Sequence, residues 1–202
     1  MALWIADKPL VLASNSEIRR KVLEDAAIPV DVHPADINER AIERKAEVTA
    51  PGAVASLLAC EKAKTVASQH AGRVVLGADQ TLALGQRRFT KPLDPAGARE
   101  QLRLLRGQTH ELHAAIALAR DETVLFEHCS VARLTMRVFS DAFLDAYVDT
   151  AGPTVTASVG GYQVEKCGIQ LFERIEGDHF TILGLPLLPL LHYLRAAGCL
   201  LA

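Results

Sequence analysis

The chain has 202 residues, of which 50% are hydrophobic and 23% are charged, and its formal net charge is -2. This length suits one domain or two closely packed lobes, and the composition excludes a disordered chain. The balance of 22 Lys and Arg against 24 Asp and Glu gives no reason to expect a nucleic-acid polymer as partner. A phosphate-binding pocket needs only a few local cations, so the composition does not exclude one.

The two ends of the chain and its cysteines favour a cytoplasmic protein that is not bound to a membrane. Charged residues and a proline interrupt the apolar N-terminal segment, which is therefore a poor signal peptide. The apolar run 182–202 contains two prolines and Arg195, so we expect a buried terminal helix and no membrane span. The four cysteines form no C-x-x-C pair, which favours reduced core residues.

The first predicted elements are a buried strand over Pro9–Ala13 and a helix that begins directly after it. Either Ser14 or Ser16 can serve as the helix N-cap. Arg19 and Arg20 lie near the first turn, where the helix dipole is already positive, and a bound anion would reduce that cost. The pattern predicts a phosphate site, although an ordinary basic surface helix is the alternative.

A strand over Ile28–Pro34 and a helix over Pro51–His70 are predicted next, with a charged segment between them. That segment, Asp36–Lys45, is either a loop or a short exposed helix, and it contains Glu39. Lys62 lies in the long helix. The usual position of a helix lysine is in solvent, so Lys62 is either a functional cation or a solvated one.

The central stretch is the buried run Val74–Leu76, which we expect to be a strand that ends at Gly77. Asp79 and Gln80 then follow the strand. Ligands of open α/β sheets bind beyond the carboxyl ends of the strands, so Asp79 is a candidate catalytic carboxylate. The alternative is that Asp79 only caps the turn.

The second half of the chain adds further strands and helices without a repeat or a long linker. Lys91 precedes a helix capped by Asp94, and the remaining predicted elements are strands over Thr109–Ala119, Ser130–Phe139 and Gly168–Arg174, a helix over Asp141–Thr150, and a final helix after Pro186. The order of elements predicts a mixed α/β sheet flanked by helices. No clean boundary divides the chain, so we expect one domain over 1–202.

Glycine-rich nucleotide motifs, the nucleophile elbow and the H-E-x-x-H zinc motif are all missing from the sequence. These absences lower the odds for a Rossmann dehydrogenase, a P-loop NTPase, an α/β hydrolase and a zinc protease. Cations that could bind phosphates and carboxylates that could bind Mg²⁺ or activate water remain. This polar set comprises Ser14, Ser16, Arg19, Glu39, Lys62, Asp79, Gln80, Lys91 and Glu165.

Five segments, taken in order, resemble the Maf family. They are LASNSEIRRKVL (12–23), LACEKAK (58–64), LGADQTLAL with KPLD (76–84 and 91–94), LRGQTHELHAAIAL (105–118) and GIQLFERIEGDHFTILGLPL (168–187). Each motif alone is weak, but the resemblance covers nearly the whole chain.

The resemblance implies a house-cleaning nucleoside triphosphate pyrophosphatase. Such an enzyme cleaves between the α- and β-phosphates with a divalent cation, Mg²⁺ or Mn²⁺, and releases a nucleoside monophosphate and pyrophosphate. The implied fold is an elongated mixed sheet with two lobes around a cleft, similar to inosine triphosphate pyrophosphatases. Homodimers are common in the family. The other functional class implied by the family is a non-catalytic nucleotide-binding regulator of cell division and septum formation.

Residue roles follow from the resemblance position by position. Asp79 matches the catalytic aspartate and a metal ligand, and Glu39 matches a carboxylate near the metal or the base. The positions that match substrate-binding residues are Ser14, Ser16, Arg19, Lys62 and Lys91.

Gln80 together with Glu165 resembles the subgroup that prefers 7-methyl-GTP, although Glu165 is equally well explained as a surface carboxylate. Two departures from the family pattern stand out. Glu17 replaces the usual proline, and segment 161–166 fits neither subgroup fully.

Overall fold

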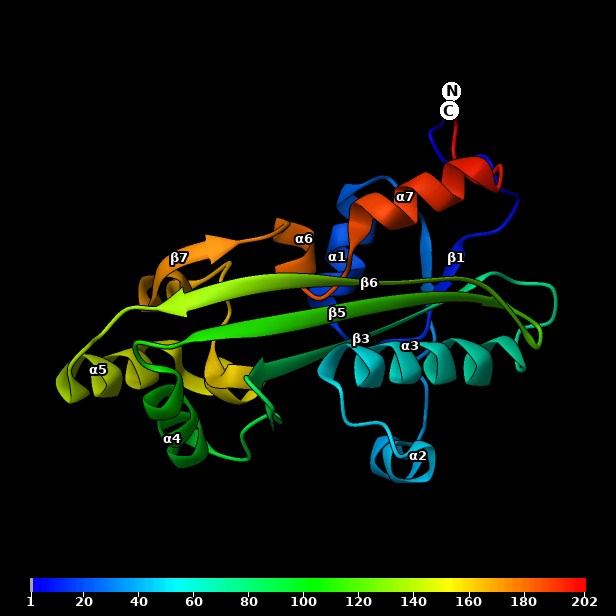
Figure 1. Cartoon of the computed structure of the whole chain (residues 1–202). Helices are drawn as coiled ribbons and strands as arrows, with labels where there is room; N and C mark the ends of the chain where they lie inside the picture. The colour runs from blue at the N-terminus through cyan, green and yellow to red at the C-terminus, as the bar shows by residue number, and fades with distance from the viewer. Residues whose placement is uncertain (1) are drawn as a thin grey trace. The chain divides into compact units, whose positions relative to one another are not determined.

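The computed structural model describes residues 2–202 and contains, within that range, a seven-stranded mixed sheet flanked by helices (Figure 1). The strand order is β2-β1-β3-β5-β6-β7, with β4 paired to β3. β1 is parallel to β2 and β3, whereas β4 is antiparallel to β3 and β7 to β6. The strands are β1 (Leu10–Leu12), β2 (Val30–Val32), β3 (Val75–Leu84), β4 (Arg87–Phe89), β5 (Thr109–Arg120), β6 (Thr123–Met136) and β7 (Phe172–Glu176). The predicted mixed α/β class is confirmed.

The helices begin and end largely where capping residues predict. Ser16, Asn38, Asp94 and Ser140 each accept a hydrogen bond from a backbone N–H of the helix that they begin. The α-helices are α1 (Glu17–Asp25), α2 (Glu39–Ala46), α3 (Pro51–Ala67), α4 (Pro95–Leu105), α5 (Asp141–Ala151), α6 (His179–Ile182) and α7 (Leu187–Ala196). Three short 3-10 segments follow α5: η1 (Gly152–Thr156), η2 (Val159–Gly161) and η3 (Cys167–Leu171). No helix within residues 2–202 is long and apolar enough to cross a membrane.

The chain forms two compact units, each assembled from separate segments. The first unit comprises residues 2–80, 114–130 and 179–202, and the second comprises residues 81–113 and 131–178. Strands β3, β5 and β6 each contribute residues to both units. Neither unit is therefore a continuous stretch of sequence.

The first unit buries both faces of its strands, because alternate residues of β1 and β3 enter two different clusters. One cluster contains Leu10, Leu12, Leu76 and Ala78 together with apolar side chains of α1 and α7. The other contains Val11, Ala13 and Val75 together with small side chains of α3. Strand β3, which carries Asp79 and Gln80, thus packs between two layers of helices.

Gly77 explains how closely α3 approaches β3 (Figure 1). A Cβ at this position would run into the backbone carbonyl of Ala59 and would lie 2.6 Å from the Ala63 nitrogen. Only a residue without a side chain leaves room for the helix backbone. We predicted that the strand ends at Gly77, and this was wrong. Gly77 lies inside β3 and allows α3 to pack directly on the strand.

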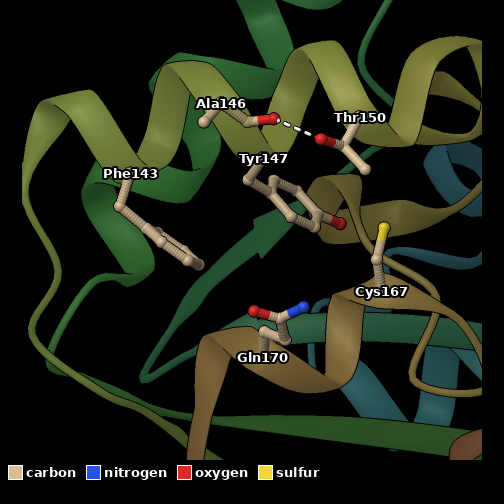
Figure 2. A pocket seen from close by; sticks show the side chains of 6 residues that line it. All are labelled: Phe143, Ala146, Tyr147, Thr150, Cys167 and Gln170. Atoms are coloured by element: carbon tan, nitrogen blue, oxygen red, sulfur yellow. Dashed lines mark hydrogen bonds between the residues drawn. The ribbon is translucent and has the colours of Figure 1, made fainter.

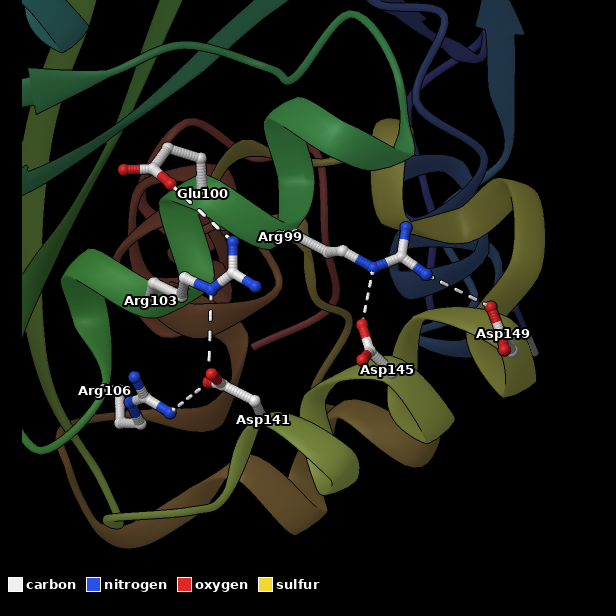
Figure 3. A network of polar contacts seen from close by, with 7 residues as sticks. All are labelled: Arg99, Glu100, Arg103, Arg106, Asp141, Asp145 and Asp149. Atoms are coloured by element: carbon white, nitrogen blue, oxygen red, sulfur yellow. Dashed lines mark hydrogen bonds and ion pairs between the residues drawn. The ribbon is translucent and has the colours of Figure 1, made fainter.

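In the second unit, arginines of α4 and the residue after it bind aspartates of α5 (Figure 3). Arg99 lies 2.9 Å from Asp145 and 3.3 Å from Asp149, and Arg106 lies 2.7 Å from Asp141. The aspartates are mostly exposed, so each pair contributes little to stability.

Several predicted boundaries were wrong. Strand β3 continues to Leu84, so Asp79 lies inside the strand. Strand β6 begins at Thr123 and not at Ser130. The prediction missed its first half because buried and exposed residues alternate only weakly there. Residues Gly168–Leu171 are 3-10 helix, and β7 begins at Phe172. The four cysteines are free thiols, and two of them are buried.

Candidate active site

The turn between β1 and α1 is organised by two serine hydroxyls. The Ser16 side chain accepts a hydrogen bond from the Arg19 backbone N–H and so caps α1. The Ser14 hydroxyl accepts hydrogen bonds from the Ser16 backbone N–H and from the Arg19 side chain, both at 3.2 Å. The capping interaction and the orientation of Arg19 are therefore parts of one local structure.

The Arg19 guanidinium is held by backbone carbonyls from two other segments of the first unit. Its Nη1 donates to Ala78 O at 2.9 Å, and its Nε donates to Gly184 O at 2.9 Å. Burial lowers the pKa of Arg19, and the charges of Asp79 and Glu39 oppose that shift. An arginine remains charged in proteins, so Arg19 is a fixed cation. The hydrogen bonds found within residues 2–202 leave the Nη2 donors available to an anion.

Asp79 and Glu39 both bind the ammonium group of Lys62. Lys62 Nζ lies 2.6 Å from Asp79 Oδ1 and 2.7 Å from Glu39 Oε1. The Lys62 and Asp79 side chains are only 13% and 12% exposed, whereas that of Glu39 is 47% exposed. The alternative that Lys62 is a solvated helix lysine is therefore wrong, because its ammonium lies in a mostly buried ion pair.

The environment of Asp79 favours its protonated form more than water does. Burial raises the pKa of Asp79, and this effect outweighs the opposite influence of Lys62 and Arg19. Glu39 adds a smaller upward contribution. A carboxyl group with a raised pKa is a better proton acceptor than a free aspartate, whose pKa is about 3.9.

The carboxylates of Asp79 and Glu39 suit a hard divalent cation in chemical type, because Mg²⁺ and Mn²⁺ prefer oxygen ligands. Residues 2–202 contain no group of three or more His, Cys, Asp or Glu side chains placed to hold a metal ion. Mg²⁺ usually retains several waters and binds through one or two carboxylates plus substrate phosphates. Asp79 and Glu39 fit that pattern, because their carboxylates meet at one point, the Lys62 ammonium group.

Gln80 points its amide nitrogen toward α6. Its Nε2 donates to Thr181 O at 3.0 Å and to Ile182 O at 3.1 Å. Lys91 and Glu165 are exposed residues of the second unit, and the residues gathered around Arg19 and Asp79 all belong to the first. The substrate-binding roles of Lys91 and Glu165 therefore stay predictions.

Sequence reasoning missed the backbone groups of this site. Gly184 has a left-handed φ of 84°, and a Cβ there would lie 3.3 Å from Arg19 Nη2 and 3.5 Å from Gln80 Cδ. Its position in a Gly-Leu-Pro segment was the available signal, because glycine before a helix start indicates a special backbone conformation. Nothing in the sequence indicates which carbonyl would orient the arginine.

Two cavities have linings that include none of Arg19, Lys62 and Asp79. One, of about 160 Å³ in the second unit, is lined by Phe143, Ala146, Tyr147, Thr150, Cys167 and Gln170, which include no Lys, Arg, Asp or Glu (Figure 2). The other, of about 320 Å³ in the first unit, lies among α1, α6 and α7 and is mainly apolar. Neither lining has the buried cations that a triphosphate requires.

A half-buried arginine with free donors, in the same unit as a mostly buried lysine–carboxylate pair, suits a protein that binds phosphorylated ligands. The family model described as "Maf-like protein" matches residues 9–197, and the chain belongs to this family. A protein of Rhodopseudomonas palustris (strain HaA2) named nucleoside triphosphate pyrophosphatase is 58% identical over 97% of both chains.

Other relatives have related names. A nucleoside triphosphate pyrophosphatase of Nitrobacter hamburgensis is 53% identical over 99% of both chains. A protein of Rhizobium etli named 7-methyl-GTP pyrophosphatase is 48% identical and covers 94% of this chain and 96% of its own. A structure titled nucleoside-triphosphatase / dITP/XTP pyrophosphatase from Mycobacterium abscessus matches 96% of this chain and 98% of its own at 15% identity, with a TM-score of 0.43.

Proposed function

We propose that this chain is a nucleoside triphosphate pyrophosphatase, which hydrolyses its substrate to a nucleoside monophosphate and pyrophosphate. The observation that carries the proposal is the Lys62–Asp79 pair, 2.6 Å between Nζ and Oδ1, in the same unit as an Arg19 guanidinium that has free donors. The names of relatives that are 53–58% identical over almost the full chain support the same activity.

In this proposal, the residues divide the work between phosphate binding and water activation. The Arg19 Nη2 group binds a phosphate oxygen and neutralises charge that develops during cleavage. Asp79 accepts a proton from the attacking water, whose oxygen bonds to the α-phosphorus while the bond from that phosphorus to the bridging oxygen breaks. Lys62 keeps Asp79 oriented and holds its pKa below the value that burial alone would give.

A divalent cation is part of the proposal, with Asp79 and Glu39 as the residues that would hold it. When bound, such a cation supplies charge neutralisation at the phosphates and makes water more acidic. Glu39 is half-exposed, so its carboxylate can exchange Lys62 for another cation at low cost.

The proposal extends to the nucleobase that the enzyme prefers. The relative named 7-methyl-GTP pyrophosphatase and the Gln80–Glu165 combination favour 7-methyl-GTP as one substrate to test. The single domain over 1–202, the homodimer, the cytoplasmic location and the house-cleaning role stay predictions.

The experiment is an incubation of the protein with Mg²⁺ and a panel of 7-methyl-GTP, dTTP, UTP and CTP, with separate detection of pyrophosphate and orthophosphate. We expect pyrophosphate from at least one nucleotide and loss of its release when Mg²⁺ is chelated. Release of orthophosphate would indicate a phosphatase. Tight nucleotide binding without any product would favour the non-catalytic regulator of cell division.

A further inference from the structure

Helix α2 carries Glu39 at its first position, and none of its eight residues is buried. Its half-buried apolar residues are Ala41 and Ile42. A helix shorter than about 12–15 residues is marginal in water unless tertiary packing stabilises it. Because α2 has little such packing, the position of Glu39 depends on how the ends of the helix are held.

The N-terminal end of α2 is held by Asn38. The Asn38 side-chain oxygen accepts a hydrogen bond from the Ala41 backbone N–H at 3.0 Å, and its backbone carbonyl accepts one from the Ile42 N–H at 3.1 Å. The side-chain bond satisfies one of the N–H groups that the first turn of a helix leaves without a partner. Asn38 is exposed, and both bonds stay within α2, so their direct effect is on this helix.

The C-terminal end of α2 is less favourable. The helix ends at Glu47, which has a left-handed φ of 54°. Glycine adopts this conformation without steric cost, whereas a residue with a Cβ does so at a cost. Of the two ends, the one capped by Asn38 therefore stabilises the helix.

The capped end of α2 is also the end that reaches the ion pair of the candidate site. Glu39 directly follows Asn38, and its Oε1 lies 2.7 Å from Lys62 Nζ. That nitrogen lies 2.6 Å from Asp79 Oδ1. Lys62 and Asp79 are mostly buried on α3 and β3, whereas the Glu39 side chain is 47% exposed. Fraying of the first turn of α2 would therefore move Glu39 and leave the other two residues in place.

We propose that Asn38 is a positioning residue: by capping α2, it keeps the Glu39 carboxylate at the Lys62 ammonium group, beside Asp79. The two carboxylates are then held together in advance, which reduces the conformational entropy lost when they bind a divalent cation. The part of this inference that concerns the cation rests on the proposed function. The placement of Glu39 by the cap does not.

Hydrogen exchange of the α2 amides, measured without nucleotide, tests the cap. Asn38→Ala removes the side-chain acceptor, and Asn38→Ser supplies another good N-cap residue. Loss of an N-cap shifts the helix equilibrium about fivefold, so exchange over residues 39–46 should be about fivefold faster in Asn38→Ala and close to the wild type in Asn38→Ser. Glu47→Gly should slow it, because glycine suits the left-handed position. Equal exchange in Asn38→Ala and the wild type would refute the cap.

Acetylation of lysines by acetic anhydride, followed by mass spectrometry, tests whether the cap acts on the ion pair. Lys64 is the internal reference, because it lies on the same helix as Lys62 and is 45% exposed. Relative to Lys64, Lys62 should react faster in Asn38→Ala than in the wild type, because Glu39 no longer covers its ammonium group. An unchanged ratio in a variant whose α2 amides exchange faster would show that the cap does not position Glu39.

The matched control is Ser140→Ala. Ser140 caps α5 by accepting a hydrogen bond from the Phe143 N–H at 3.1 Å in the second unit, whereas Glu39 and Asp79 belong to the first. The Mg²⁺ concentration for half-maximal pyrophosphate release should rise about two- to fivefold in Asn38→Ala, with kcat at saturating Mg²⁺ retained. It should stay at the wild-type value in Ser140→Ala and in Asn38→Ser.

An equal rise in Ser140→Ala, or no rise in Asn38→Ala, would overturn the link between the cap and the cation. A wild type that hydrolyses no nucleotide would instead refute the proposed function. Hydrogen exchange and acetylation need neither nucleotide nor metal, so they would still decide whether Asn38 places Glu39.

Discussion

Replacing Lys62 with methionine tests the buried ion pair at the centre of the site. Methionine has a similar length and lacks the ammonium group. The variant leaves the Asp79 carboxylate, whose side chain is 12% exposed, without the cation that lies 2.6 Å from it. Glu39 loses the same partner, but its side chain is 47% exposed and can be hydrated.

The expected cost follows from these exposures. Removing one partner of a buried pair costs about 3–5 kcal/mol, whereas an exposed pair contributes about 0–1 kcal/mol. Because water still reaches part of both side chains, we expect a loss of about 3 kcal/mol in the free energy of unfolding at pH 8. For a chain of this length that corresponds to a decrease of roughly 6–12 °C in Tm.

The cost should depend on pH through Asp79. Burial raises the pKa of Asp79 in the folded protein, and the charge of Lys62 is the largest influence in the opposite direction. Removing the Lys62 ammonium should therefore raise the pKa of Asp79 further. A carboxyl group with a raised folded pKa contributes stability that is complete below its unfolded value of about 3.9 and is lost as pH rises through the folded value. The difference between wild type and Lys62→Met should therefore be largest at alkaline pH and smallest near pH 4.

Urea unfolding at several pH values measures this difference. Lys64→Met is the matched control, because Lys64 lies on the same helix, is 45% exposed and pairs with Glu61 at 3.3 Å. It should cost less than about 1 kcal/mol at every pH. The double variant Lys62→Met/Asp79→Asn should recover most of the loss. A Lys62→Met cost equal to that of Lys64→Met, or one independent of pH, would refute the buried pair.

Two other predictions concern packing and a buried histidine. Gly77→Val should cost more than about 2 kcal/mol or prevent folding, because its side chain would meet the backbone of α3 at Ala59 and Ala63; thermal unfolding measures this, and near-wild-type stability would contradict the close approach. Burial lowers the pKa of His110 from 6.5 to about 4, so its contribution to stability is complete above pH 6.5 and is lost as pH falls toward 4. His110→Phe should flatten that part of the pH–stability curve, and an unaltered slope would assign it to other groups.

The sequence predicted the parts of the site that depend on local patterns. Arg19 was predicted correctly at the first turn of α1. The signals were a buried strand followed by two serines at a helix start, and they suffice because capping depends on local sequence. Asp79 and Lys62 could be named individually, and the family resemblance put them in one site. Their 2.6 Å contact, however, depends on how α3 packs against β3.

What the sequence did not predict depends on long-range packing. Gly77 suggested the end of a strand, but its role is to admit the α3 backbone, and the strand continues through Asp79 to Leu84. Gln80 contacts carbonyls about a hundred residues away in the chain. A backbone carbonyl is present in every residue and leaves no signature in the sequence, so neither the contacts of the Gln80 amide nor the orientation of Arg19 could be predicted.

In the proposed mechanism, Asp79 activates the water that hydrolyses the nucleoside triphosphate. The direct test is the rate of pyrophosphate release by the wild type and by Asp79→Asn, with the best nucleotide of the panel and Mg²⁺. Since general-base catalysis contributes about 10²–10⁴-fold, we expect turnover to fall by at least about a hundredfold in a variant that unfolds as cooperatively as the wild type. Turnover within a fewfold of the wild type would contradict the account.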